Sequence, residues 1–234
     1  MPLRLHHAIP MPASDVEGHG IQETLAREVK REMGWALVTG VDVAYGERTK
    51  TSQMAYAVAV TVSTSNWRPV EIQRWKGPAP MPYMSGLLGF READPMLEAL
   101  LKLTNTPDVI FVDGNGQAHP RKFGLACHIG VSLDHPTIGI AKNYPAGCGD
   151  PKTANFGKSK RGNKMAIMLG SLKVGYELVT QDDTNPIYVS VGNRLGLDEA
   201  VSLVVKATPV YRLPEPIRAA DQEANKFRAE HEGQ

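Results

Sequence analysis

Hydrophobic and polar residues follow two different rhythms in the first third of the chain. Between Ile21 and Met33 apolar residues recur every four positions, which predicts a helix with one apolar stripe that ends near Gly34. Beyond this helix the apolar residues gather in short runs that are separated by polar turns, as is typical of strands joined by hairpins. We therefore predict an antiparallel meander of three strands, at Trp35–Tyr45, Gln53–Val62 and Pro69–Lys76.

Helices and short strands alternate in the remainder of the chain. Three prolines between Gly77 and Gly86 exclude a helix or a central strand in that segment. Tyr144–Asn163 is polar, rich in glycine and basic at its end, which predicts an exposed loop. The other runs predict helices at Leu87–Thr104 with an interruption at Pro95, at Lys122–Leu133, at Leu197–Lys206 and after Pro216, and strands at Asp108–Val112, Pro136–Ala141, Met165–Leu169, Tyr176–Thr180 and Ile187–Val191.

A meander followed by strand–helix–strand units predicts an α/β fold with a mixed central sheet and helices on both faces. The chain has 234 residues, of which 42% are hydrophobic, so it can bury the core of one domain, which we predict to span residues 1–234.

Composition narrows the setting. No apolar run is long enough to cross a bilayer, and no apolar run of the kind found in signal peptides follows the first residues. We therefore expect a cytoplasmic protein that does not bind a membrane. Cys127 and Cys148 form neither a disulfide framework nor a zinc-binding spacing. With 26 basic and 25 acidic residues, a nucleic-acid site would need a local basic face on a nearly neutral body.

Carboxylates on two strands are the sharpest chemical signal. Asp42 interrupts an apolar strand and Asp113 ends another, and buried charges of this kind are costly unless a cation compensates them. Glu92 and Asp198 could add further oxygen ligands, and an all-oxygen set suits Mg²⁺ or Mn²⁺. The alternative is that Asp42 pairs with a lysine or arginine while Asp198 only caps its helix.

Loops after the strands offer further candidates. Glycines in the segment Asp113–Gly116 could present backbone N–H groups to a ligand, although a tight turn would look the same. Lys142, at the end of a strand, is either a solvated terminal lysine or a phosphate-binding group. Tyr83 lies in the proline-rich loop, where it either pins the loop to the core or wedges into a base stack.

Taken in order, these segments resemble the endonuclease V family, whose members are nucleases that act at deaminated adenine (inosine) in nucleic acid. The resemblance runs from about Gly40 to Arg218. The chain departs from the usual family pattern at Met84, Ser85 and at Asn115 and Asn193. The matching pieces are Val41–Tyr45, Met81–Gly86, Phe90–Glu92, Phe111–Gly114, His119–Arg121, Pro136–Lys142, Gly192–Arg194 and Tyr211–Pro216.

For the reaction centre, the resemblance implies a ribonuclease-H-like fold and Mg²⁺, with Mn²⁺ as a substitute. Asp42 and Asp113 would hold the metal, with Glu92 in the same cluster. Asp198 matches another acidic position of that cluster, and Lys142 matches a lysine near the scissile phosphate.

For the substrate, the resemblance implies that Tyr83 is a wedge and that Gly86, Gly114 and His119 surround the pocket for an extruded base. The implied reaction is hydrolysis of the second phosphodiester bond on the 3′ side of deoxyinosine in DNA, by a monomer. Three alternatives stay open: the same reaction on inosine in RNA, a general nuclease of the ribonuclease-H-like class, and a non-catalytic inosine-binding module.

Overall fold

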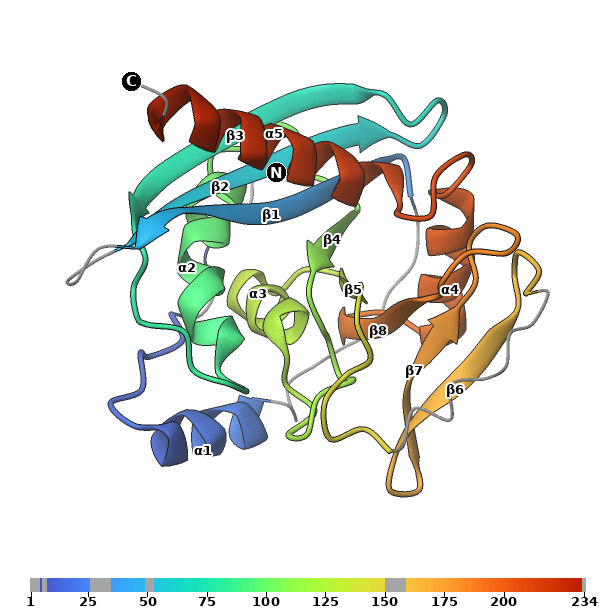
Figure 1. Cartoon of the computed structure of the whole chain (residues 1–234), viewed down its shortest axis with the longest axis horizontal. Coiled ribbons are helices and arrows are strands. Elements are labelled where there is room, and N and C mark those ends of the chain that lie inside the picture. The colour runs from blue at the N-terminus through green and yellow to red at the C-terminus, as the bar shows by residue number, and fades with distance from the viewer. Residues whose placement is uncertain (1–4, 6–7, 26–34, 49–52, 150–158, 233–234) are drawn as a thin grey trace.

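One mixed sheet of eight strands organises the molecule, in the spatial order β3-β2-β1-β4-β5-β8-β7-β6 (Figure 1). The computed structural model describes residues 5, 8–25, 35–48, 53–149 and 159–232. The strands are β1 (Leu37–Arg48), β2 (Gln53–Ser63), β3 (Pro69–Pro78), β4 (Val109–Asp113), β5 (Thr137–Ala141), β6 (Lys164–Leu169), β7 (Leu172–Leu178) and β8 (Ile187–Asn193). The helices are α1 (Asp15–Leu25), α2 (Leu88–Leu100), α3 (Leu125–Leu133), α4 (Leu197–Lys206) and α5 (Glu215–Glu232).

Pairing within the sheet confirms the predicted topology. Strands β1, β2 and β3 form an antiparallel meander, whereas β4 lies parallel to both β1 and β5. Helix α3 connects β4 to β5, as expected for a parallel pair that needs a crossover. The chain therefore has the predicted α/β fold with a mixed sheet.

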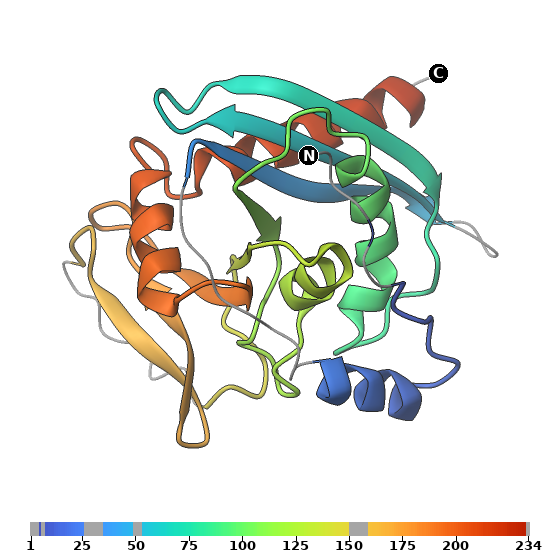
Figure 2. The same cartoon turned by 180° about the vertical axis from the view of Figure 1, so that it is seen from behind.

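Helices cover both faces of this sheet (Figures 1 and 2). Side chains of β2 alternate between the faces: Val58 and Val60 pack in the core that also contains residues of α4 and α5, whereas Ala57 and Ala59 pack with residues of α2 and α3. Alternate burial on two faces explains why β2 is apolar along nearly its whole length.

Several element boundaries differ from the predicted ones. Helix α1 begins at Asp15 rather than Ile21, and residues 26–34 of the predicted helix lie outside the described residues. Helix α3 begins later than predicted because Lys122 has a positive φ of 55°. Strand β3 extends to Pro78, which is tolerated because β3 is an edge strand.

Helix α2 is not interrupted at Pro95, contrary to the prediction. Proline cannot donate a backbone hydrogen bond to the carbonyl four residues earlier, which here belongs to Arg91. The hydroxyl of Tyr45 donates to that Arg91 carbonyl at 3.5 Å. A side chain from β1 thus reaches the carbonyl that the proline leaves free.

Helix α5 lies along β1 at very close range. A Cβ atom at Gly40 would lie 2.0 Å from the carbonyl oxygen of Pro216, so only glycine allows the start of α5 to pack on the strand there. At the other end of the same contact, Glu232 accepts a hydrogen bond from the Glu47 backbone N–H at 3.1 Å. The strand therefore fixes the position of α5 near both of its ends.

None of the helices in the described ranges combines the length and the hydrophobicity that crossing a membrane requires.

We expect Gly40→Ala to lower the free energy of unfolding by about 2–3 kcal/mol, because the new methyl group would push α5 away from β1. Urea denaturation followed by circular dichroism measures this change. Gly20→Ala is the matched control: a Cβ atom at Gly20, in α1, has no neighbour within 4 Å. It should raise stability slightly, by up to about 1 kcal/mol. Equal unfolding midpoints for Gly40→Ala and the parent would contradict the close packing.

Candidate active site

Three carboxylates converge where β1, β4 and α5 meet. Parallel pairing places Val41 opposite Val112, so that the next residues, Asp42 and Asp113, lie side by side. Both valines belong to the core under α2 and α3, so the two aspartates point to the opposite face, which α5 covers. Asp221 of α5 completes the acidic cluster, since oxygen atoms of all three carboxylates lie within 4.8 Å of one another.

Asp221 takes the place that the sequence assigned to Asp198. The Asp198 carboxylate lies at the start of α4, where it binds the Lys164 ammonium at 2.9 Å and its side chain is 71% exposed. The hydrogen bond from Lys164 lowers the pKa of Asp198. Asp198 is therefore an exposed, ion-paired residue near a helix start, and its assignment to the acidic cluster is wrong.

The sequence does carry a signal for Asp221. Buried residues of α5 include Ile217, Ala220 and Ala224, which form the stripe that packs on the sheet. Asp221 is four residues after Ile217 and three before Ala224, so it lies on the edge of this apolar stripe. Its side chain is 39% exposed, so the edge of the stripe is a position that both the sheet and a ligand from solvent can reach.

Burial together with mutual repulsion marks this cluster as short of positive charge. Burial, followed by the charge of Asp113, raises the pKa of Asp42 well above its usual value. Burial also raises the pKa of Asp113, an effect that Asp221 strengthens and Lys142 opposes. Neighbouring carboxyl groups that bind a divalent cation have raised pKa values when the cation is absent, because nothing then offsets their burial and repulsion.

Lys142 is the cation that the fold itself supplies to the cluster. Its Nζ lies 2.7 Å from Asp113 Oδ2 and 3.4 Å from Asp221 Oδ1. Burial opposes the charge of Lys142, but the hydrogen bond and the attraction of Asp113 outweigh it, so its pKa is raised. One ammonium group faces three carboxylates, so the ionised cluster keeps a net negative charge that a metal ion could neutralise.

Glu92 lies beside the cluster rather than among its three mutually close carboxylates. Burial raises the pKa of Glu92 to about 8, with a further contribution from Asp113, while Arg91 opposes the shift. The Glu92 carboxyl also shares a hydrogen bond with the Tyr45 side chain. Near neutral pH, without a cation, this glutamate is therefore largely protonated.

A loop with an exposed aromatic tip, Met81–Gly86, projects beside these residues. Tyr83 is 65% exposed at the tip. At one end of the loop the Met81 carbonyl accepts a hydrogen bond from the Arg91 guanidinium. At the other end the Gly86 carbonyl accepts one from Arg121 Nη2 at 2.8 Å. The loop is thus held at both ends while Tyr83 stays free to meet a ligand.

The residues that were predicted to surround a base pocket differ in the contacts that they make. His119 lies at Gly86, whose carbonyl its ring hydrogen-bonds, and burial lowers the pKa of His119 to about 4. The Gly114 N–H donates to the Ile140 carbonyl at 3.1 Å, and the Gly116 N–H donates to Ser190 Oγ at 2.8 Å. These two N–H groups are already bonded within the protein, so neither is free to donate to a ligand, whereas a place for Gly114 around the base pocket stays a prediction.

Other candidate groups have structural roles. The Asn193 amide donates to the Gly130 carbonyl at 2.8 Å, which joins β8 to α3. Cys127 is buried, and burial raises the pKa of its thiol to about 12. In the polar loop that precedes β6, the Arg161 guanidinium donates to backbone carbonyls and Lys160 pairs with Asp182 at 2.8 Å. The part of that loop between residues 150 and 158 lies outside the described residues.

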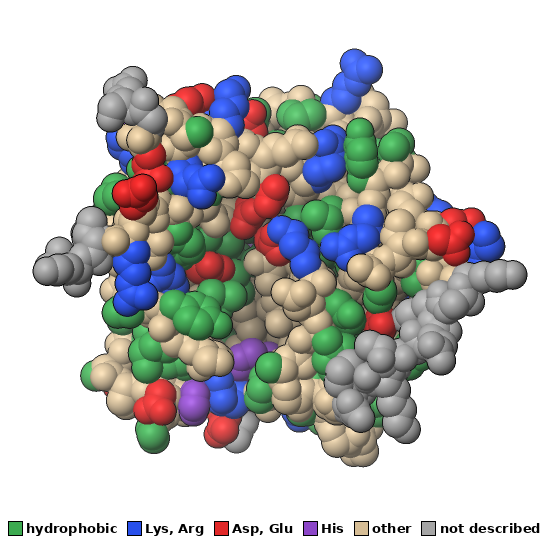
Figure 3. Space-filling view, in the orientation of Figure 1, with side chains coloured by type: hydrophobic (Ala, Val, Ile, Leu, Met, Phe, Trp, Pro, Cys, Tyr) green, Lys and Arg blue, Asp and Glu red, His purple; other side chains and the backbone are tan. Residues whose placement is uncertain are grey.

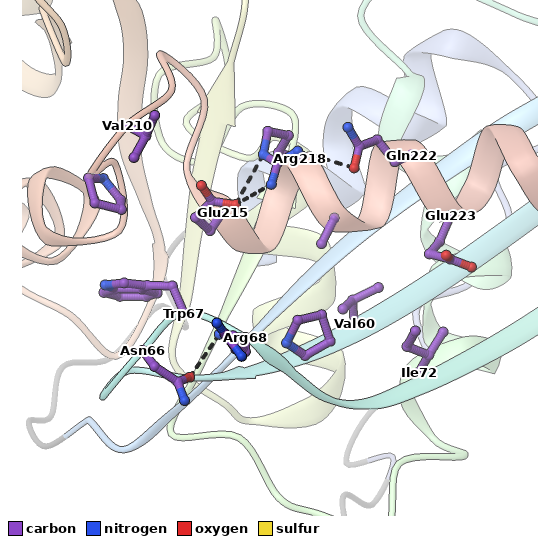
Figure 4. Close-up of a pocket in the computed structure, with 13 residues that line it drawn as sticks. Val60, Asn66, Trp67, Arg68, Ile72, Val210, Glu215, Arg218, Gln222 and Glu223 are labelled. Carbon is purple, nitrogen blue, oxygen red and sulfur yellow. Dashed lines mark hydrogen bonds and ion pairs between the residues drawn. The ribbon is translucent and has the colours of Figure 1, made fainter.

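On the molecular surface, acidic side chains lie at a depression near the centre of one face, with lysine and arginine side chains beside them (Figure 3). A separate cavity of about 440 Å³ lies between α5 and the β2–β3 turn, lined by Trp67, Arg218 and Glu223 among others (Figure 4). Its lining includes none of the three clustered aspartates, and Arg218 is bonded there to Glu215 at 2.6 Å. This cavity is therefore not the place of the acidic cluster.

Comparison with known proteins agrees with this geometry. The family model for endonuclease V matches residues 20–222. Endonuclease V of Nocardia farcinica is 38% identical over 218 residues, which cover 92% of this chain and 92% of that protein.

Solved structures give the same result. The crystal structure of endonuclease V from Streptomyces avermitilis superposes with a TM-score of 0.81 at 35% identity, over 98% of this chain and 99% of that one. Endonuclease V of Ciona intestinalis, solved in complex with a 24mer DNA that contains an inosine followed by a ribo-adenosine, superposes with a TM-score of 0.80 at 28% identity, over 90% of this chain and 96% of that one.

We expect Asp221→Asn to weaken the binding of Mn²⁺ at least about 10-fold, because the amide offers one oxygen and no charge. Isothermal titration calorimetry of the metal-free protein measures the affinity. Asp198→Asn is the matched control and should keep the parent's affinity. Equal affinities for all three proteins would show that Asp221 holds no cation.

Glu92 should stabilise the metal-free protein less and less as pH rises from 5 to 8. Over this range folded Glu92, with a pKa of about 8, keeps a proton that the unfolded chain, with a value near 4.5, has lost. In Glu92→Gln this contribution is absent, so the stability of the parent relative to this variant should fall with pH in urea denaturation. Asp198→Asn should keep the parent's slope, because the pKa of Asp198 is lowered from 3.8 and it titrates below this range. An unchanged slope in Glu92→Gln would refute the raised pKa.

Proposed function

This chain belongs to the endonuclease V family, and on that premise we propose that it hydrolyses DNA at the second phosphodiester bond on the 3′ side of deoxyinosine, using Mg²⁺. The products would carry 3′-hydroxyl and 5′-phosphate ends, and the reaction would begin the repair of deaminated adenine. The observation that carries the proposal is the convergence of Asp42, Asp113 and Asp221, the last two of which are paired with Lys142.

The donor set fits a hard divalent cation. Asp42, Asp113 and Asp221 offer carboxylate oxygens only, and such ligands favour Mg²⁺ or Mn²⁺ over softer metals. The raised pKa values of Asp42 and Asp113 support the same conclusion, since a bound cation would offset both the burial that chiefly raises them and the repulsion that adds to it. When bound there, the metal would polarise the scissile phosphate and lower the pKa of a water molecule.

Lys142 and Glu92 have separate tasks in this proposal. The Lys142 ammonium is 37% exposed and is held by Asp113, so it can bind a phosphate oxygen without leaving the cluster. Glu92 is buried beside Asp113 with a pKa of about 8, which makes it a group that can hold or release a proton near neutral pH. The two side chains are thus suited to orient the phosphate and to exchange a proton.

Selection of inosine is assigned to the loop Met81–Gly86 and to His119. An enzyme that acts at a base in a duplex extrudes it from the stack, and an exposed aromatic side chain fills the gap. Tyr83 has the required exposure, and its loop is anchored at both ends. His119 and the Gly86 carbonyl lie together at the base of this loop, so we place the pocket for hypoxanthine beside them.

The proposal is tested by incubating the protein with one duplex that contains a single deoxyinosine and with the same duplex that contains adenine. We expect nicking of the inosine strand with Mg²⁺ and none on the adenine duplex or with a chelator. Asp113→Asn should lower the single-turnover rate at least about 100-fold while leaving the fold intact, because it removes a metal ligand. The control is Asp198→Asn, which should nick at the parent's rate.

Inosine in RNA is a second candidate substrate, because the Ciona intestinalis relative was solved on a DNA with a ribo-adenosine directly after the inosine. A matched series with DNA, RNA and a single ribonucleotide 3′ to the inosine decides between the two. Faster cleavage of RNA would transfer the proposal to RNA. Binding of inosine strands without any Mg²⁺-dependent nicking would replace it by a non-catalytic inosine-binding module.

A further inference from the structure

One backbone carbonyl, that of Gly86, receives hydrogen bonds from three separate parts of the chain. Arg121 Nη2 donates to it at 2.8 Å and Gln22 Nε2 at 3.5 Å. The ring of His119 also hydrogen-bonds this carbonyl. We call this arrangement of Gln22, His119 and Arg121 around the Gly86 carbonyl the Gly86 clamp.

Arg121 and Gln22 also bind each other. Arg121 Nε donates to Gln22 Oε1 at 2.6 Å, so the glutamine amide accepts from the arginine and donates to the same carbonyl that the arginine binds. Gln22 is a polar side chain that is only 1% exposed. Since a buried amide is costly unless it is hydrogen-bonded, the fold must place Gln22 at this point for these bonds.

Gln22 belongs to α1, which lies near the start of α2 (Figure 1). Gly18, one helical turn before Gln22, lies against Leu87 and Phe90 at the start of α2. Helix α1 therefore packs on the start of α2, which directly follows the Met81–Gly86 loop. Its contact with the loop passes through Gln22.

Gly86 is the point at which the loop turns. It has a φ of 79°, in the left-handed region, so its carbonyl direction depends on a conformation that other residues rarely adopt. Rotation of this peptide would swing Met84 and Tyr83, which precede it and are exposed. Because three donors converge on the carbonyl, the clamp opposes that rotation.

His119 is fixed by the same residues. Its Nδ1 accepts a hydrogen bond from the Arg121 backbone N–H at 3.3 Å, so the proton of the neutral ring is on the other nitrogen. Burial and the Arg121 charge keep the ring neutral, with a pKa of about 4. The Arg121 side chain therefore holds the Gly86 carbonyl, while its backbone N–H sets the tautomer of the neighbouring histidine.

We propose that Gln22 and Arg121 are positioning residues for base extrusion: through the Gly86 carbonyl they hold the loop at the angle from which Tyr83 enters the base stack. This inference rests on the proposed function. It assigns a role in substrate selection to the N-terminal helix, which contributes no group to the acidic cluster.

The clamp should matter for cleavage of duplex substrates and much less for cleavage of single strands. In a duplex the wedge must replace an extruded base, whereas in a single strand the inosine is already largely unstacked. Loss of the clamp should therefore reduce cleavage of duplex far more than cleavage of the same strand alone. Tyr83→Ala should show the same preference.

Single-turnover cleavage measures this separation. A hydrogen bond from a charged donor is worth a factor of about 10 to 100, so Arg121→Met should slow duplex cleavage by about that factor and single-strand cleavage by less than about 3-fold. Gln22→Glu keeps the acceptor for Arg121 Nε but loses the donor to Gly86, so its loss should be smaller. The fluorescence of 2-aminopurine placed beside the inosine should rise less on binding of Arg121→Met than of the parent.

A second measurement needs no substrate. The Leu87 amide donates to the Met84 carbonyl at 3.1 Å and reports on the end of the loop. Hydrogen exchange of this amide should be about 10-fold faster in Arg121→Met and in Gln22→Met than in the parent. Arg74→Met is the matched control, because it removes an arginine that is paired with Glu223 and Glu230 instead.

Equal losses on duplex and single strand, or unchanged exchange at Leu87, would overturn the clamp. If the parent itself nicks no inosine substrate, the proposed function fails, while the exchange measurement still decides whether Gln22 and Arg121 hold the loop. If Arg121→Met does not fold, Gln22→Glu tests both points in its place, because it retains the bond to Arg121 Nε.

Discussion

Close contact between the Gly40 backbone and the carbonyl of Pro216 decides where helix α5 lies, and the acidic cluster depends on that position. Asp42 is two residues beyond Gly40 on the strand, and Asp221 is five residues beyond Pro216 on the helix. A helix set further from the sheet by a larger side chain would carry Asp221 away from its two partners. The parallel register of β1 and β4 supplies the other half of the geometry, because it aligns Asp42 with Asp113 without any further contact.

This geometry places charge where the fold alone cannot neutralise it. Lys142 reaches two of the three carboxylates, yet the pKa values of Asp42 and Asp113 stay raised. Groups with raised pKa values cost stability at neutral pH, because the folded chain must either keep protons or bear the repulsion. Such a cost is typical of a site that is built for a ligand of opposite charge, and it explains why the cluster is set into so rigid a framework of strand and helix.

The sequence predicted a residue's role where that role follows from its immediate neighbours in the chain, and not where it follows from the packing of distant segments. Alternating and four-residue patterns predicted the meander, the parallel pair and the acidic residues on β1 and β4, because a charge in an apolar strand is visible in the sequence itself. The apolar stripe beside Asp221 is visible in the sequence, but the surface on which that stripe packs is not, so the sequence alone could not rank Asp221 above Asp198. The docking of α5 brings Asp221 to the sheet, whereas Asp198 lies in the first turn of α4, where it is exposed and paired with Lys164. Likewise, the bonds made by the Gly114 and Gly116 N–H groups depend on β5 and β8, which the sequence does not position.

Arg91 joins the two parts of the candidate site. Its guanidinium holds the Met81 end of the loop and stacks on the Tyr45 ring, 4.2 Å from the ring centre, while its neighbour Glu92 shares a hydrogen bond with Tyr45. Displacement of the loop would therefore act on the packing around Glu92, and through it on the acidic cluster. Since the other end of the loop is tied to α1 and the cluster is completed by α5, residues near both ends of the described chain control one surface. Neither part of the candidate site is therefore contained in a single segment of the described chain.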